Sequence, residues 1–140
     1  MYVLPPVFQL SFVGVADPGV PNFERIVLRP TEEVNLAQFG VLLGLPEADG
    51  SATPLRDQFF WFGDLVVRPP AWILLYTGAG EFTTSYVAPD NVPAYSFHWG
   101  KPTVVFGAGS PLVPMVFGMG GVHVGHTLSS TEVRRLKGPR

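Results

Sequence analysis

The sequence predicts an all-β protein: a single-domain antiparallel sandwich or barrel-like fold with an extended N-terminal segment and a short C-terminal tail. Short apolar runs recur along the chain, and turn signals separate them at roughly the 8–12-residue spacing of such folds. Prolines in or beside these runs favour edge strands and strand starts. Because the chain has 140 residues, one domain is expected. We place this domain at residues 1–127, with residues 1–6 as an N-terminal arm and residues 128–140 as a basic tail.

The first two predicted strands alternate between apolar and polar side chains. In residues 7–15, Phe8, Leu10 and Phe12 fall on one face of a half-buried strand. Residues 24–29 alternate in the same way, with two aliphatic side chains facing away from two arginines. This period of two is typical of strands that cover one side of a core.

Residues 31–45 fit two structures. A threonine followed by two glutamates can cap a helix with an apolar stripe behind it. Gly40 and Gly44 weaken a helix, and the apolar run that begins at Val41 suits a buried strand equally well. We favour extended structure here and keep the helix as the alternative. Residues 46–56, rich in turn formers, follow as the clearest predicted loop.

The second half of the chain continues this pattern. Its further apolar runs are 59–67, 72–76, 82–87, 95–99, 103–106 and 112–124. The first of them opens with four consecutive aromatic residues, which places aromatic rings on both faces of one strand. Both faces of that strand are therefore expected to need cover. Near the C-terminus, Ser129 and Glu132 have the spacing of a capping box, which predicts a short helical turn over residues 133–137.

Charged side chains are scarce: they make up 14% of the chain, against 46% apolar residues, whereas soluble proteins average about 25% charged residues. This balance excludes global disorder. The absence of cysteine excludes a disulfide framework and a cysteine-ligated zinc site. Residues 1–16, 71–80 and 102–131 carry no formal charge, and no apolar run is long enough for a membrane helix.

The few charges are unevenly placed. Four of the nine basic residues, Arg134, Arg135, Lys137 and Arg140, lie at the C-terminal end, and the chain before them has five basic against eleven acidic residues. An acidic body argues against nucleic-acid binding, which needs a basic surface. The basic tail has three interpretations: it is solvated, it docks on an acidic neighbouring subunit, or, as the weakest of the three, it contacts nucleic acid, for which four charges are a small footprint.

No motif for catalysis or metal binding is complete. His123 and His126 lack the further ligands that a metal site needs. Ser110 lacks the flanking glycines of a nucleophile elbow, and the glycine clusters match no phosphate-binding loop. We therefore expect no enzymatic activity, no cofactor and no metal. A hydrolase that uses His98 or His123 is the weakest hypothesis we keep.

The aromatic residues are the more informative candidates, because large rings serve β-cores, protein interfaces and sugar-stacking platforms alike. The sequence leaves these three roles open. The candidate interaction residues are Tyr2, Leu4, Phe8, Trp61, Trp72, Tyr76, Trp99, Arg134, Arg135 and Lys137.

Long uncharged stretches in so small a domain indicate apolar surface that other subunits cover. The function we expect is that of a non-enzymatic structural subunit in a homo-oligomer or larger protein assembly, placed in a virion or in the cytoplasm. The composition is similar to that of small β-rich virion proteins of tailed phages, including capsid-stabilising and tail components, although no motif carries over residue roles. The alternative is a soluble binding module for glycans or small apolar ligands.

Overall fold

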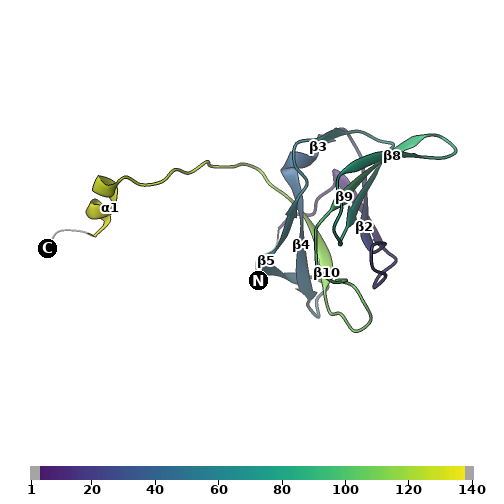
Figure 1. Cartoon of the computed structure of the whole chain (residues 1–140), viewed down its shortest axis with the longest axis horizontal. Helices are drawn as coiled ribbons and strands as arrows, with labels where there is room; N and C mark the ends of the chain where they lie inside the picture. The colour runs from purple at the N-terminus through teal and green to yellow at the C-terminus, as the bar shows by residue number, and fades with distance from the viewer. Residues whose placement is uncertain (1–3, 138–140) are drawn as a thin grey trace.

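The computed structural model describes residues 4–137, and it shows packed β-sheets from which a long C-terminal segment extends (Figure 1). One sheet contains β1 (Leu10–Ala16), β2 (Arg25–Pro30), β7 (Trp72–Tyr76), β9 (Val92–His98) and β8 (Thr83–Val87), in this spatial order. A second contains β10 (Val113–Gly118), β4 (Phe39–Pro46) and β5 (Ala52–Trp61), and a small pair is formed by β3 (Val34–Asn35) and β6 (Val66–Val67). The chain also forms a 3₁₀ turn, η1 (Leu36–Gln38), and one helix, α1 (Ser130–Leu136).

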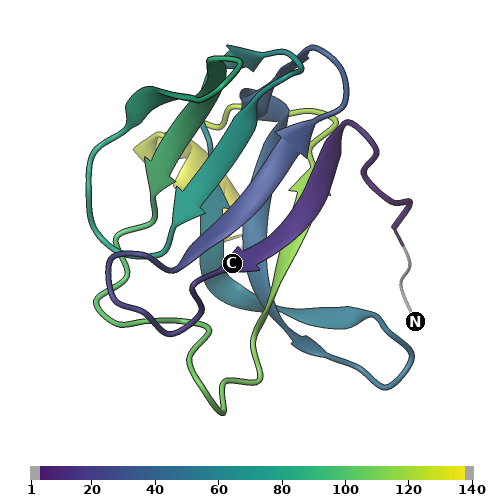
Figure 2. The ribbon, with the colours of Figure 1, turned by 90° about the vertical axis from the view of Figure 1, so that its right-hand side faces the viewer.

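The architecture is a sandwich. The sheets pack face to face without closing into a barrel, so the all-β prediction is confirmed in its sandwich form. In Figure 2 the five-stranded sheet faces the viewer and the three-stranded sheet lies behind it. One pair departs from the antiparallel pattern, because β7 and β9 run parallel. After β7 the chain reverses direction and forms the edge strand β8. A hairpin then reverses it again into β9, which lies between β7 and β8 and therefore runs parallel to β7.

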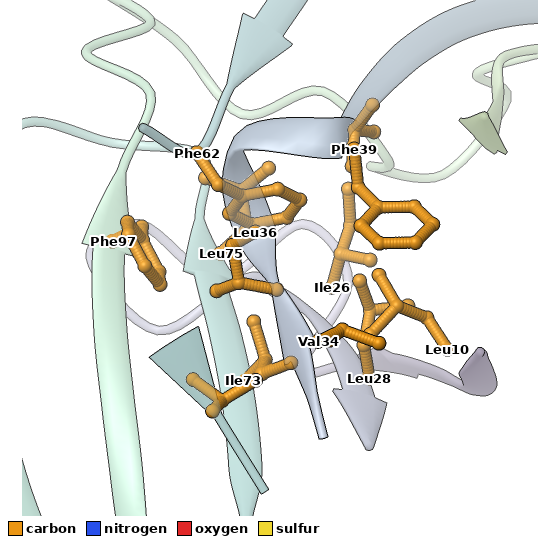
Figure 3. Close-up of a cluster of buried hydrophobic side chains, with 12 residues drawn as sticks. Leu10, Ile26, Leu28, Val34, Leu36, Phe39, Phe62, Ile73, Leu75 and Phe97 are labelled. Carbon is orange, nitrogen blue, oxygen red and sulfur yellow. The ribbon is translucent and has the colours of Figure 1, made fainter. Parts of the chain in front are cut away.

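The core lies between the two larger sheets. Along β2 the predicted alternation is confirmed, since Ile26 and Leu28 are fully buried and their neighbours Arg25, Val27 and Arg29 are only partly buried. The same alternation buries Ile73 and Leu75 in β7. Figure 3 shows these side chains converging with aromatic rings from the rest of the sandwich. Each such side chain stabilises the fold by about 1.5–3 kcal/mol through burial.

Residues 31–45 are extended apart from η1, as favoured from the sequence. The glycines in this segment have a packing role in β4. A Cβ atom on Gly40 would lie 2.4 Å from the Phe59 ring and 2.8 Å from the Phe60 carbonyl oxygen. The Phe59 side chain of β5 therefore lies across β4 at Gly40, where only glycine leaves room.

The predicted loop at residues 46–56 is wrong over half its length. The turn occupies residues 47–51, and β5 begins at Ala52. Thr53 and Pro54 pair with Leu45 and Gly44 of β4. Because β5 is an edge strand, a proline is tolerated in it despite the missing N–H.

The first strand is less amphipathic than predicted. Of the three residues expected on its inner face, only Leu10 is buried, whereas Phe8 precedes the strand and is 75% exposed, and Phe12 is 49% exposed. The reason is that β1 lies at the sheet edge and its register with β2 shifts after Phe12. An edge strand has no neighbour on one side to cover its side chains.

Two late apolar runs also differ from expectation. Residues 103–106 form no strand, and the run at 112–124 is a strand only up to Gly118. The first of these runs supplies backbone donors to a buried carboxylate, that of Glu24 directly before β2.

The Glu24 side chain is 1% exposed and accepts four hydrogen bonds. Its Oε2 atom accepts from Thr77 Oγ1 at 2.6 Å and from the Val105 amide at 2.7 Å. Its Oε1 atom accepts from the Gly19 amide at 2.9 Å and from the Phe106 amide at 2.6 Å. Burial by itself raises the pKa of Glu24, but these hydrogen bonds outweigh burial and hold the pKa below its ordinary value of 4.5. One ionised group thus ties together the turn before β2, the end of β7 and the loop that leads into β10.

Replacing this carboxylate tests its role in stability. We expect Glu24→Gln to lower the free energy of unfolding at neutral pH by about 1.5–3 kcal/mol, the cost of losing hydrogen bonds to a charged acceptor. Because folding lowers the pKa of Glu24, the wild-type carboxylate stabilises the fold above pH 4.5, and this contribution is lost as the pH falls through the lowered pKa. The variant should therefore lose less stability than the wild type on acidification. Urea unfolding between neutral and acidic pH measures both effects.

The exposed Glu32→Gln variant is the matched control. It should change the stability by less than about 0.5 kcal/mol. Equal stability of Glu24→Gln and the wild type at neutral pH would show that the buried carboxylate is not an anchor.

Candidate functional site

The strand β10 borders the candidate site. It pairs with β4 from Val113 opposite Gly44 to Gly118 opposite Phe39. Among residues 4–137 no strand pairs with the other edge of β10, which is an outer strand of its sheet. An unpaired edge presents backbone N–H and C=O groups that a further strand can use.

An apolar groove of about 710 Å³ runs beside this edge. It is lined by residues 4–7 and 9, residues 38, 39 and 42, residues 51, 52 and 54, and residues 115–120. The longer polar side chains in the lining are Gln9 and Gln38, and none of the lining residues is charged. Such a lining fits an apolar segment better than a charged ligand.

The N-terminal segment forms one wall of the groove. It is held to the body by Thr31, whose amide donates to the Gln9 carbonyl oxygen at 3.0 Å and whose hydroxyl donates to the Phe8 carbonyl oxygen at 2.7 Å. Leu4 lines the groove while it remains 61% exposed. Tyr2, also predicted to be an interaction residue, lies outside the described residues. The predicted contact of residues 1–6 with a neighbouring copy stays a prediction.

Aromatic rings occupy the outer face of the three-stranded sheet. Phe59 and Trp61 of β5 are 42% and 52% exposed. The Phe59 ring contacts that of Phe117 in β10, with 5.1 Å between the ring centroids. The Trp61 indole donates to the Ala37 carbonyl oxygen at 2.8 Å, which orients its ring. As expected, β5 carries aromatic rings on both of its faces. The rings on the outer face are partly exposed in the described chain.

The other candidate rings are engaged within the body and do not join Trp61 in one row. The Arg29 guanidinium lies 4.0 Å from the ring centroid of Trp72. Tyr76 stacks on His98 with 5.1 Å between the ring centroids. Trp99 is partly buried against the core. Trp72 and Tyr76 belong to the five-stranded sheet, whereas Trp61 belongs to the three-stranded one.

The C-terminal arm, residues 119–137, leaves the body at the end of β10. The Met119 amide donates to the Gln38 carbonyl oxygen at 2.7 Å, and beyond this point the chain runs away from the sandwich with α1 at its far end (Figure 1). Val122 and Val124 are 89% and 84% exposed. The sequence placed these valines at the end of the apolar run 112–124, so residues 122–128 were not predicted to be an interaction segment, whereas Arg134, Arg135 and Lys137 further along the arm were. The available signal was the placing of Val122, Val124 and Leu128 at even-numbered positions, with His126 between them.

The helix α1 confirms the predicted capping box. The Ser129 hydroxyl accepts from the Glu132 amide, and the Glu132 carboxylate accepts from the Ser129 amide. Hydrogen bonding of the Glu132 carboxylate to the Ser129 amide and side chain holds the pKa of Glu132 below its usual value. Arg134 and Arg135 lie in the last turn, where cations oppose the helix dipole, and Lys137 caps it. No residue of α1 is buried.

The turn between β4 and β5 carries two acidic side chains, Glu47 and Asp49, close in sequence to the groove lining. Glu47 accepts from the Thr53 hydroxyl at 2.6 Å, and Asp49 accepts from the Ser51 hydroxyl at 2.6 Å. The hydrogen bonds from Ser51 hold the pKa of Asp49 below its usual value. This turn is therefore negatively charged at neutral pH.

The residues considered for catalysis or metal binding are dispersed. His123 and His126 lie exposed in the arm, and the described residues contain no group of three or more metal-ligating side chains. The Ser110 hydroxyl donates to the Val105 carbonyl oxygen at 2.7 Å and serves the loop before β10. His98 packs against Tyr76, with a buried Nδ1 atom that has no hydrogen-bond partner in the described chain.

The chain matches no protein-family model, no curated protein and no solved structure. Within residues 4–137, no helix has the length and apolar character needed to span a membrane. The arm and the groove beside β10 are thus the features from which a function is argued.

Proposed function

We propose that this chain is a non-enzymatic structural subunit that assembles with further copies of itself through its C-terminal arm. The observation that supports the proposal best is the exposure of Val122 and Val124 on a segment that leaves the body. Exposed apolar surface that is contiguous and held apart from the core is typical of protein interaction sites.

The helix α1 supports the same proposal. It spans seven residues, Ser130–Leu136, and buries none of them. Isolated helices of this length are not stable in water, even with a good cap. A helix with a complete capping box but no packing surface of its own is therefore expected to be completed by a partner.

The charges favour another copy as that partner. The arm ends in a basic cluster, whereas the chain before Arg134 has eleven acidic and five basic residues. Attraction between the end of one arm and the body of the next copy would favour association and would weaken with added salt. We place this subunit in a virion, as a capsid-stabilising or tail component, on the resemblance of composition alone.

Charged substitutions in the arm test the proposal. We expect the double variant Val122→Asp, Val124→Asp to remain monomeric at concentrations where the wild type self-associates, because buried charges would oppose the contact. Both positions are highly exposed within the chain, so the body should keep its stability. Sedimentation velocity over a series of concentrations measures the association.

The matched control places two aspartates on the other side of the same segment, at His123 and Thr127, and should still associate. A wild-type chain that sediments as a monomer at every concentration would contradict the proposal. Association that survives in the valine variant would show that the arm does not carry it.

The exposed pair Phe59 and Trp61 favours one alternative function, a module that binds glycans or small apolar ligands by stacking. In that case Trp61→Ala should abolish oligosaccharide binding, measured by fluorescence titration. Trp72→Ala should retain it, because the Trp72 ring is engaged by Arg29. Absence of oligosaccharide binding by the wild type, or binding unchanged in Trp61→Ala, would exclude this alternative.

A further inference from the structure

We infer that the groove beside β10 is the acceptor site for residues 122–128 of a second copy, which add to the free edge of β10 as an antiparallel strand. This inference rests on the proposed self-association and names the surface that receives the arm.

The arm segment has the pattern of a half-buried strand that lacks a sheet. Successive side chains of a strand point to opposite sides, so Val122, Val124 and Leu128 share one side with His126, while His123 and Thr127 share the other. The first three are 89%, 84% and 42% exposed. The segment therefore presents a face with three apolar side chains and His126, and the two valines on it are almost fully exposed in the described chain.

The groove offers what this segment lacks. It combines the unpaired edge of β10 with an uncharged lining that includes Leu4, Phe39 and Met115. Residues 102–131 contain no Asp, Glu, Lys or Arg, so the ionisable side chains that residues 122–128 would bring to the groove are two histidines, His123 and His126. Seven residues of strand extend about 23 Å, and β10 itself has six residues.

The occupant is a second copy because the arm lines its own groove only with Met119 and Gly120 and is directed away from it beyond them. The hydrogen bond from the Met119 amide to the Gln38 carbonyl oxygen holds the chain beside η1 directly after the end of β10. Figure 1 shows the arm continuing outward from the body. A fold-back would need the chain to reverse at Gly120 and Gly121, which the structure does not do.

Charge favours the antiparallel direction. The start of β10 lies near the β4–β5 turn, because Val113 pairs with Gly44. An incoming antiparallel strand would end there, and the helix that follows it would bring Arg134 and Arg135 towards Glu47 and Asp49. Antiparallel pairing is also slightly more stable per residue than parallel pairing.

Disulfide trapping tests this inference directly, because the natural chain has no cysteine. Full-length Met115→Cys is mixed with full-length Val122→Cys, Val124→Cys or Leu128→Cys under mild oxidation. Neighbouring strands bring opposing Cα atoms to about 4.5–5.5 Å, within the range that a disulfide spans. We expect a linked dimer of the two variants in at least one mixture. The matched control, Thr84→Cys on the exposed strand β8, should give none.

A second acceptor position keeps the test decisive if the Met115→Cys variant does not fold. Leu4→Cys replaces an exposed side chain on the opposite wall of the groove and should link to the same arm variants. Sedimentation of the wild type under the same conditions separates the two proposals. Association without a link to either position would overturn the groove as acceptor and leave self-association standing, whereas a monomeric chain would overturn both.

One further variant shows whether the groove is occupied by the arm of a second copy or by the arm of the same chain. A chain that carries both Met115→Cys and Val124→Cys is oxidised at a dilution where the wild type is monomeric. We expect it to stay unlinked at this dilution. A disulfide within one chain would show that the arm fills its own groove and would contradict the second copy as occupant.

Discussion

The buried carboxylate of Glu24 is the interaction on which the arrangement of this protein depends. Its four hydrogen bonds come from a turn, from the end of a central strand and from the loop before β10. A charge 1% exposed to solvent is tolerated only because donors replace the water it has lost. These contacts hold the loop that leads into β10, the strand that borders the groove.

The scarcity of charged residues in the sequence extends to the exposed sheet edge at β10. Natural sheets protect their edges with charges, bulges or cover, because unpaired edges recruit other strands. Here β1 carries a bulge after Phe12, whereas β10 borders an uncharged groove. The edge strand β10 itself has one protective residue, Pro114, and no charged side chain. A weakly protected edge is a liability in a free monomer and can recruit a partner strand in a subunit. In the proposed assembly, the exposed arm that follows β10 directly would supply the matching strand.

The local patterns of the sequence were sufficient for the parts of the fold that follow from local physics. Alternation placed Ile26 and Leu28 in the core, and the spacing of Ser129 and Glu132 predicted the helix cap. The patterns failed where contacts distant in sequence decide the outcome. Residues 103–106 are apolar enough for a strand, but their amides bind a carboxylate some eighty residues earlier in the chain.

The candidate site was predicted in part for the same reason. Leu4 and the basic residues of the tail could be chosen from composition, but the groove is built from four separate stretches of chain. Trp72, Tyr76 and Trp99 could not be told apart from Trp61, because exposure of a ring depends on its tertiary neighbours. The sequence pattern at residues 122–128 was visible, but it does not show whether this segment is covered. The structure shows that no sheet covers it in the described chain.

Hydrogen exchange of the full-length chain at increasing concentration measures the central claim most directly. Amides in a strand ladder exchange slowly, whereas amides of an extended, solvated segment exchange rapidly. We predict that residues 122–128 and the free edge of β10 become protected together as the concentration rises, while the core strands β2 and β7 are protected throughout. An oligomer in which residues 122–128 still exchange as rapidly as in the dilute protein would contradict the account.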